Sequence, residues 1–162
     1  LLATSASAQR DRRTFFLAQL LFWMLRAPDG HAKNFSLFIL PTGAYALTPL
    51  YDVMSAWPVI GEGPNQLSAH KVKLAMAVRT TNAHWRMKDI LPRHWVEIGK
   101  RYGVLDEDGQ TAKSVIHGIV EQTPQVVASI ESSLPKGFPE SVSGPILHGL
   151  QQASEQLART SD

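Results

Sequence analysis

The chain has 162 residues, enough for one domain with a buried core, and its 44% hydrophobic and 19% charged residues are typical of a soluble globular protein. Sixteen Lys and Arg against fourteen Asp and Glu give a net charge of +2, which is too small to indicate a nucleic acid or an anionic membrane as a partner. The chain has no cysteine, which excludes disulfides, thiol catalysis and thiolate metal sites and fits a reducing cytoplasm.

The N-terminal stretch carries no targeting signal that we recognise. Residues 1–13 lack a basic segment followed by an apolar one, so a signal peptide is not expected. The longest apolar run, residues 15–25, is interrupted by Gln19 and is too short to span a bilayer. The first residue is not Met, and we expect a fragment of a longer polypeptide. The prediction is a cytoplasmic protein without membrane association.

The first predicted element is a helix. Large apolar side chains recur at helical spacing over Thr14–Arg26 and indicate a mostly buried helix. Pro28 and Gly30 end this pattern. Residues 29–33 are therefore expected to form a loop.

A β-hairpin is expected next. Asn34–Leu40 is apolar nearly throughout, as in a strand covered on both faces, and Tyr45–Thr48 predicts a second short strand. Pro41–Ala44 between them has the composition of a turn. Asp52 then lies just beyond the hairpin.

The remainder of the chain reads as a Pro- and Gly-rich surface loop over residues 53–66 and a series of helices. The expected helices are Lys71–Val78, Lys88–Tyr102, Asp106–Ile130 and Ser141–Leu157. Pro92 fits only the first turn of its helix, and Pro124 predicts a break or kink. The prediction is a single, mainly α domain over residues 1–162 with a small β-hairpin.

Three oxygen-bearing side chains occur around this hairpin in the order that phosphoryl transfer requires. Asp29 is followed five residues later by Asn34, and Asp52 comes after the second strand. In protein kinases an Asp at this spacing accepts the proton of the attacking hydroxyl, the Asn binds Mg²⁺, and a later Asp completes the metal site. On a continuous helix Asp29 and Asn34 would point about 140° apart, so a loop is needed for them to converge.

The same pattern suggests roles for the neighbouring residues. The carboxamide of Asn34 and the carboxylate of Asp52 are hard oxygen ligands that suit Mg²⁺ shared with the phosphates of ATP. Lys33 would place a positive charge near the transferred phosphate, and His31 either shapes the loop or contacts phosphate. The pattern alone is equally compatible with structural roles, in which Asp29 caps a turn, Asn34 begins a strand and Asp52 ends one.

Two longer runs of residues are more specific than this spacing. They are Ala27-Pro-Asp-Gly-His-Ala-Lys-Asn-Phe-Ser36 and Tyr45-Ala-Leu-Thr-Pro-Leu-Tyr-Asp-Val53. They resemble the signature of the HipA family of bacterial serine/threonine kinases, and residues 72–76, 91–94 and 133–139 are similar to its C-terminal domain. The resemblance covers nearly the whole chain and implies a helical, kinase-like C-lobe with a catalytic β-hairpin.

The resemblance implies that Asp29 is the catalytic base, that Asn34 and Asp52 bind Mg²⁺, and that ATP is the phosphate donor. It implies a Ser or Thr of a translation protein, typically an aminoacyl-tRNA synthetase, as acceptor. It also implies a type II toxin–antitoxin module, neutralised by a DNA-binding, HipB-like antitoxin and linked to growth arrest and persistence. Trp57, in the Pro-rich loop after Asp52, is a further candidate contact for a substrate peptide.

The chain departs from eukaryotic-type kinases in two places, both compatible with the HipA pattern. Ala27 stands where those kinases have His two residues before the Asp, and Val53-Met54 replaces the Phe-Gly that follows their metal-binding Asp. The family's N-terminal lobe, with its Gly-rich loop and ATP-binding Lys, is absent from the chain. Residues 1–162 alone are therefore expected to bind Mg·ATP weakly and to transfer phosphate poorly.

Two other functions share part of this pattern. A small-molecule phosphotransferase also uses Asp and Asn at this spacing, but that class usually has His where Ala27 stands. A non-catalytic module that holds the antitoxin would leave the polar set at positions 29, 34 and 52 without a purpose, but an isolated fragment is still compatible with that role. The sequence therefore favours a protein kinase.

Overall fold

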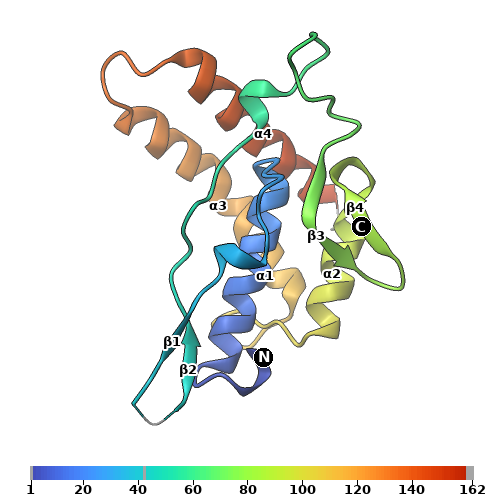
Figure 1. The fold of residues 1–162 in the computed structure, drawn as a ribbon, viewed down its shortest axis with the longest axis vertical. Helices are drawn as coiled ribbons and strands as arrows, with labels where there is room; N and C mark the ends of the chain where they lie inside the picture. The colour runs from blue at the N-terminus through green and yellow to red at the C-terminus, as the bar shows by residue number, and fades with distance from the viewer. Residues whose placement is uncertain (1, 42, 160–162) are drawn as a thin grey trace.

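The computed structural model describes residues 2–41 and 43–159 and is mainly α-helical, with two small antiparallel sheets (Figure 1). The helices are α1 (Ala8–Met24), α2 (Pro92–Arg101), α3 (Ala112–Ser133) and α4 (Glu140–Ala158). One sheet pairs β1 (Leu37–Ile39) with β2 (Tyr45–Leu47), and the other pairs β3 (Lys73–Arg79) with β4 (Ala83–Arg86). The predicted fold class, a mainly α domain with a small β-hairpin, is confirmed.

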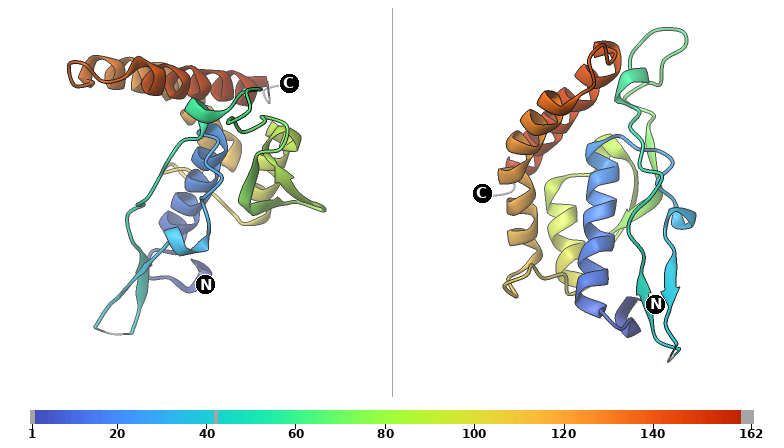
Figure 2. Two further views of the ribbon diagram at one scale, coloured as in Figure 1. Left: turned by 45° about the horizontal axis from the view of Figure 1, so that its top comes forward. Right: turned by 90° about the vertical axis from the view of Figure 1, so that its left-hand side faces the viewer.

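Helix α1 is the central element of the core. Its Trp23 is fully buried, packs edge-on against Trp95 of α2 with ring centroids 6.1 Å apart, and donates its Nε1–H to the carbonyl of Met87 at 2.9 Å. Helix α4 crosses the C-terminal end of α1 and contributes the buried Leu157 to the same core (Figures 1 and 2). The C-terminal end of α1 is thus a rigid base for the loop that follows it.

The predicted helix over Lys71–Val78 is wrong, because this segment forms strand β3. Burial alternates along it: Val72, Leu74 and Val78 are buried, whereas Lys71 and Lys73 are exposed. A period of two fits a half-buried strand and not a helix. The prediction missed this alternation in favour of the helix-forming Lys, Leu, Ala and Met residues.

Helix α3 runs through Pro124 without the predicted break. Proline has no N–H and cannot bond to the carbonyl of Val120, one turn earlier. In the structure Ser154 of α4 donates its hydroxyl to that carbonyl at 3.4 Å. The neighbouring helix therefore supplies the missing donor, which a single-helix pattern cannot reveal.

Several predicted boundaries are also corrected. Helix α1 begins at Ala8 rather than Thr14, and α3 begins at Ala112 rather than Asp106. The first strand is shorter than predicted and is not covered on both faces, since Phe38 of β1 is 55% exposed. Helix α2 begins at Pro92 rather than Lys88, and the prediction that Pro92 lies in the first turn is confirmed.

Candidate functional site

The site begins where α1 ends in a helix-terminating motif. Ala27 N–H bonds to Phe22 O at 2.8 Å and Arg26 N–H to Trp23 O at 3.1 Å, which is the paired pattern of a Schellman motif. The left-handed position of this motif usually holds Gly, but here it holds Arg26, with φ of 53°. Pro28 follows and prevents the helix from continuing. This sharp stop delivers Asp29 to the surface beside the helix.

Gly30 is required here for space, and not only to stop the helix. A Cβ at this position would come closer than 3.0 Å to three atoms of the buried Phe22 ring. The backbone after Asp29 therefore lies directly on α1. Asp29 itself is exposed, and its Oδ1 lies 3.5 Å from Nε2 of the half-buried His31.

A short 3₁₀ helix, Ala32–Asn34, turns the chain so that the side chain of Asn34 is buried. Its carboxamide oxygen accepts the N–H of His31 at 3.0 Å, and its Nδ2 donates to Oδ2 of Asp52 at 3.1 Å. An N–H on one side and a carboxylate on the other fix the orientation of the amide. The structure therefore brings the polar ends of Asn34 and Asp52 together in a direct hydrogen bond, while their predicted role as Mg²⁺ ligands stays a prediction.

Asp52 lies in an unusual backbone conformation. Its φ is 55°, in the left-handed region, which costs about 1 to 3 kcal/mol for a non-Gly residue. The neighbouring Tyr51 donates its hydroxyl to the carbonyl of Lys33 at 2.7 Å, and the same hydroxyl oxygen lies 2.8 Å from Oγ of Ser36. These bonds hold the segment after the hairpin against the segment before it, so that Asp52 stays opposite Asn34.

The hairpin between these two segments is anchored to α1 by Asp11, a residue that the sequence did not single out. Asp11 is 1% exposed; its Oδ2 accepts the backbone N–H of Leu47 at 2.9 Å and the hydroxyl of Ser5. Arg10 approaches its other oxygen at 3.5 Å. No local pattern marks this role, because Asp11 and its partner on β2 are 36 residues apart.

The remaining predicted site residues, Asp29, His31 and Lys33, lie in the segment between α1 and Asn34. Asp29 and Lys33 are both exposed. The backbone carbonyl of Lys33 accepts the hydroxyl of Tyr51, the residue before Asp52. In the described residues no direct bond joins Asp29 to Asp52. The two are connected in steps, from Asp29 to His31 and from His31 through Asn34.

Asn34 and Asp52 are the side chains of this site that could hold a metal ion. Asp52 offers an exposed carboxylate beside a carboxamide, and both are oxygen ligands of the kind Mg²⁺ prefers. Residues 2–41 and 43–159 contain no cluster of three or more His, Cys, Asp or Glu that could hold a metal without further ligands. The carboxamide oxygen points to His31, so Asn34 would bind a cation through its second lone pair or after its amide turns.

None of the helices in the described part of the chain is both long and apolar enough to cross a membrane. The basic residues Lys71 and Lys73 are exposed on and just before β3 rather than on the predicted helix.

A comparison with protein families matches a family model to most of the chain. The family model of the HipA-like C-terminal domain matches residues 1–127, which include α1, the hairpin, both sheets, α2 and the first part of α3. The match contains the whole site described above. Helix α4 lies beyond it.

Proposed function

Because the chain belongs to the family of HipA-like C-terminal domains, we propose that it is the catalytic lobe of a Mg·ATP-dependent serine/threonine protein kinase. The observation that supports this most strongly is the contact between Nδ2 of Asn34 and Oδ2 of Asp52 at 3.1 Å. Eighteen residues and a hairpin separate the two side chains, and the fold still brings their polar ends together. The contact is made although the backbone of Asp52 is in the left-handed region, which is strained for a non-Gly residue.

The chain's own residues divide the work of phosphoryl transfer. Asp29, exposed at the loop tip, would orient the acceptor hydroxyl and receive its proton. Asn34 and Asp52 would hold Mg²⁺, which neutralises charge on the ATP phosphates when bound. Lys33 would add a positive charge near the transferred group, with His31 holding the loop through its backbone N–H. The upstream lobe of the full-length protein would complete the phosphate clamp.

The proposals for the acceptor and the partner are supported by the resemblance to the family. We propose a Ser or Thr hydroxyl on a translation protein, of the aminoacyl-tRNA synthetase type, as acceptor. We propose that a DNA-binding antitoxin neutralises the kinase in a toxin–antitoxin pair. The exposed apolar side chain of Met54, two residues after Asp52, offers surface against which an upstream lobe or a substrate could pack.

The test uses the full-length protein with γ-³²P-ATP, Mg²⁺ and purified translation proteins. We expect label on one Ser or Thr of an acceptor protein, dependent on Mg²⁺ and lost in Asp52→Ala. Label on a small-molecule alcohol with none on protein would instead support the small-molecule phosphotransferase. An active protein whose Asp52→Ala variant transfers phosphate at the wild-type rate would contradict the proposed site.

A further inference from the structure

Two side chains that follow Asp52 bind the end of α1. Ser55 donates its hydroxyl to the carbonyl of Leu25 at 2.8 Å, and Trp57 donates its Nε1–H to the carbonyl of Met24 at 2.8 Å. Carbonyls at a helix C-terminus lack partners within the helix and require donors from elsewhere. The segment after Asp52 is therefore fixed to the same rigid base from which the loop of Asp29 starts.

Trp57 also holds the strained residue at that base. The guanidinium of Arg26 lies over the ring of Trp57, 5.2 Å from its centroid, and over that of Trp23 at 5.6 Å. Its burial lowers the pKa of the Arg26 guanidinium. Cation–π contact with two rings compensates for the left-handed backbone that Arg26 adopts. Trp57 therefore joins the segment that follows Asp52, to which it belongs, to the segment that leads to Asp29.

Helix α4 closes the other side of the indole. A Cβ at Gly149 would come closer than 3.0 Å to three atoms of the Trp57 ring, so the α4 backbone lies directly on it. Helix α4 is in turn held to the core by the buried Ala153 and Leu157 (Figures 1 and 2). The residues of α4 lie outside the family match, which ends at residue 127.

We propose that Trp57 is a positioning residue for Asp52 and that α4, through Gly149, is part of the catalytic unit. The inference rests on the proposed function, in which Asp52 binds the metal of Mg·ATP. A left-handed Asp persists only where its surroundings determine it from both sides. Asn34 and Tyr51 do so on one side. On the other side, Ser55 and Trp57 fix the chain to α1 three and five residues beyond Asp52.

The expected signature is a change in KM for Mg·ATP with little change in kcat. If the contacts of Trp57 are weakened, Asp52 adopts its binding conformation in a smaller fraction of molecules. The apparent affinity for Mg·ATP falls by that fraction. Saturating Mg·ATP then restores the competent form, and the chemical step proceeds as before. A general loss of folded protein would instead lower kcat and leave KM unchanged.

The decisive variant is Gly149→Ala in the full-length protein, with Gly118→Ala as matched control. Gly118 lies in α3 and has no atom within 4 Å of an added Cβ. We expect Gly149→Ala to raise KM for Mg·ATP about tenfold, with kcat within about twofold of wild type, and Gly118→Ala to change neither. We expect Trp57→Phe, which keeps a ring but loses the Nε1–H, to raise KM less.

A second readout does not depend on catalysis. Amide hydrogen exchange over residues 51–56 should be faster in Gly149→Ala and in Trp57→Phe than in Gly118→Ala. If Gly149→Ala does not fold, Trp57→Phe is used for both measurements. Unchanged KM and unchanged exchange in a folded variant would overturn the proposal, as would equal effects in Gly118→Ala. Failure of the proposed function appears separately, as wild-type activity that survives Asp52→Ala.

Discussion

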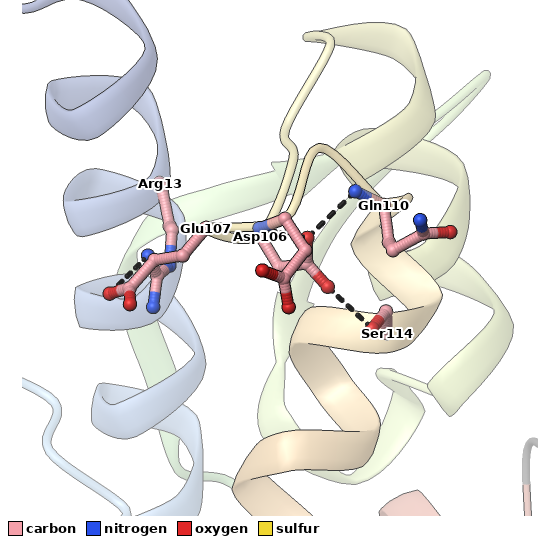
Figure 3. A network of polar contacts seen from close by, with 6 residues as sticks. Arg13, Asp106, Glu107, Gln110 and Ser114 are labelled. Atoms are coloured by element: carbon pink, nitrogen blue, oxygen red, sulfur yellow. Dashed lines mark hydrogen bonds and ion pairs between the residues drawn. The ribbon is translucent and has the colours of Figure 1, made fainter.

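Two aspartates at turns differ in how fully the protein satisfies them. Asp106 precedes α3, and its carboxylate accepts the hydroxyl of Ser114 at 2.6 Å and the backbone N–H groups of Gln110 and Asp108 at 2.7 and 3.0 Å (Figure 3). These bonds, that from Ser114 first, lower its pKa. Asp52 accepts one side-chain bond, from Asn34, within the described part of the chain, and does so from a strained backbone.

The difference separates a carboxylate that holds the fold from one that is available for chemistry. The network of Asp106 uses both carboxylate oxygens to order the turn into α3, and Arg13 joins the same turn to α1 through Glu107 at 2.8 Å (Figure 3). Asp52 keeps free lone pairs at the surface. Strain and incomplete pairing at one site are expected where binding, rather than stability, has shaped the residues.

The largest effect is expected at the site. In the full-length protein, Asp29→Asn and Asp52→Ala should each lower phosphoryl transfer about 10³-fold or more, because each removes a group that the proposed function places in the transition state. Circular dichroism and thermal unfolding of Asp29→Asn should stay close to wild type, since Asp29 is exposed. Asp52→Ala should keep the helical circular dichroism but unfold at a lower temperature, because it leaves Nδ2 of the buried Asn34 without its acceptor. The matched control is Asp106→Asn, which should keep kcat. If Asp106→Asn lost phosphoryl transfer while Asp29→Asn and Asp52→Ala kept it, the assignment of Asp29 and Asp52 to the site would be contradicted.

The largest loss of stability is expected at the hairpin anchor. Asp11→Ala leaves the Leu47 N–H without its acceptor inside the protein and should lower the free energy of unfolding by about 3 kcal/mol. Urea denaturation measures this, with the exposed Glu131→Ala on α3 as control. A loss below about 1 kcal/mol would mean that the hairpin is held mainly by other contacts.

A smaller effect is expected for Asp106 as the pH falls. Because its folded pKa is lowered, the stability it provides is complete above its ordinary pKa of about 3.9 and is lost as the pH falls through the folded value. At pH 6 the melting temperature of wild type should be higher than that of Asp106→Asn. This difference in melting temperature should become smaller as the pH is lowered toward 3. A constant difference would rule out titration of this carboxylate as its source.

The smallest effect is expected at a pair of stacked histidines. The rings of His84 and His94 lie 3.9 Å apart, and burial, followed by the charges of His84 and Arg93, lowers the pKa of His94. Its neutral form therefore stabilises the fold above the ordinary pKa of about 6.5, and this stability decreases as the pH falls below that value. Denaturation midpoints at pH 7.5 and pH 5.5 should differ less in His84→Gln than in wild type. The exposed His70→Gln should behave like wild type.

The sequence predicted those parts of the molecule that depend on local pattern. The helical core around Trp23 and the hairpin followed from periodicity and turn residues. The kinase-like spacing singled out Asn34 and Asp52, which the fold brings into hydrogen-bond contact, but their predicted metal-binding role stays a prediction. Strand β3 was missed because residues 71–78 are good helix formers whose two-residue alternation is short. The anchors at Asp11 and Trp57 could not be predicted, since each depends on a partner far along the chain.

The most direct test of the site is metal binding in the presence of nucleotide. Electron paramagnetic resonance can follow Mn²⁺, in place of Mg²⁺, bound to the full-length protein with a non-hydrolysable ATP analogue. We expect wild type and Asp106→Asn to bind the ion equally and Asp52→Ala to bind it at least about tenfold more weakly, because one of the two proposed protein ligands is lost. Equal binding by Asp52→Ala and wild type would contradict a metal site at Asn34 and Asp52.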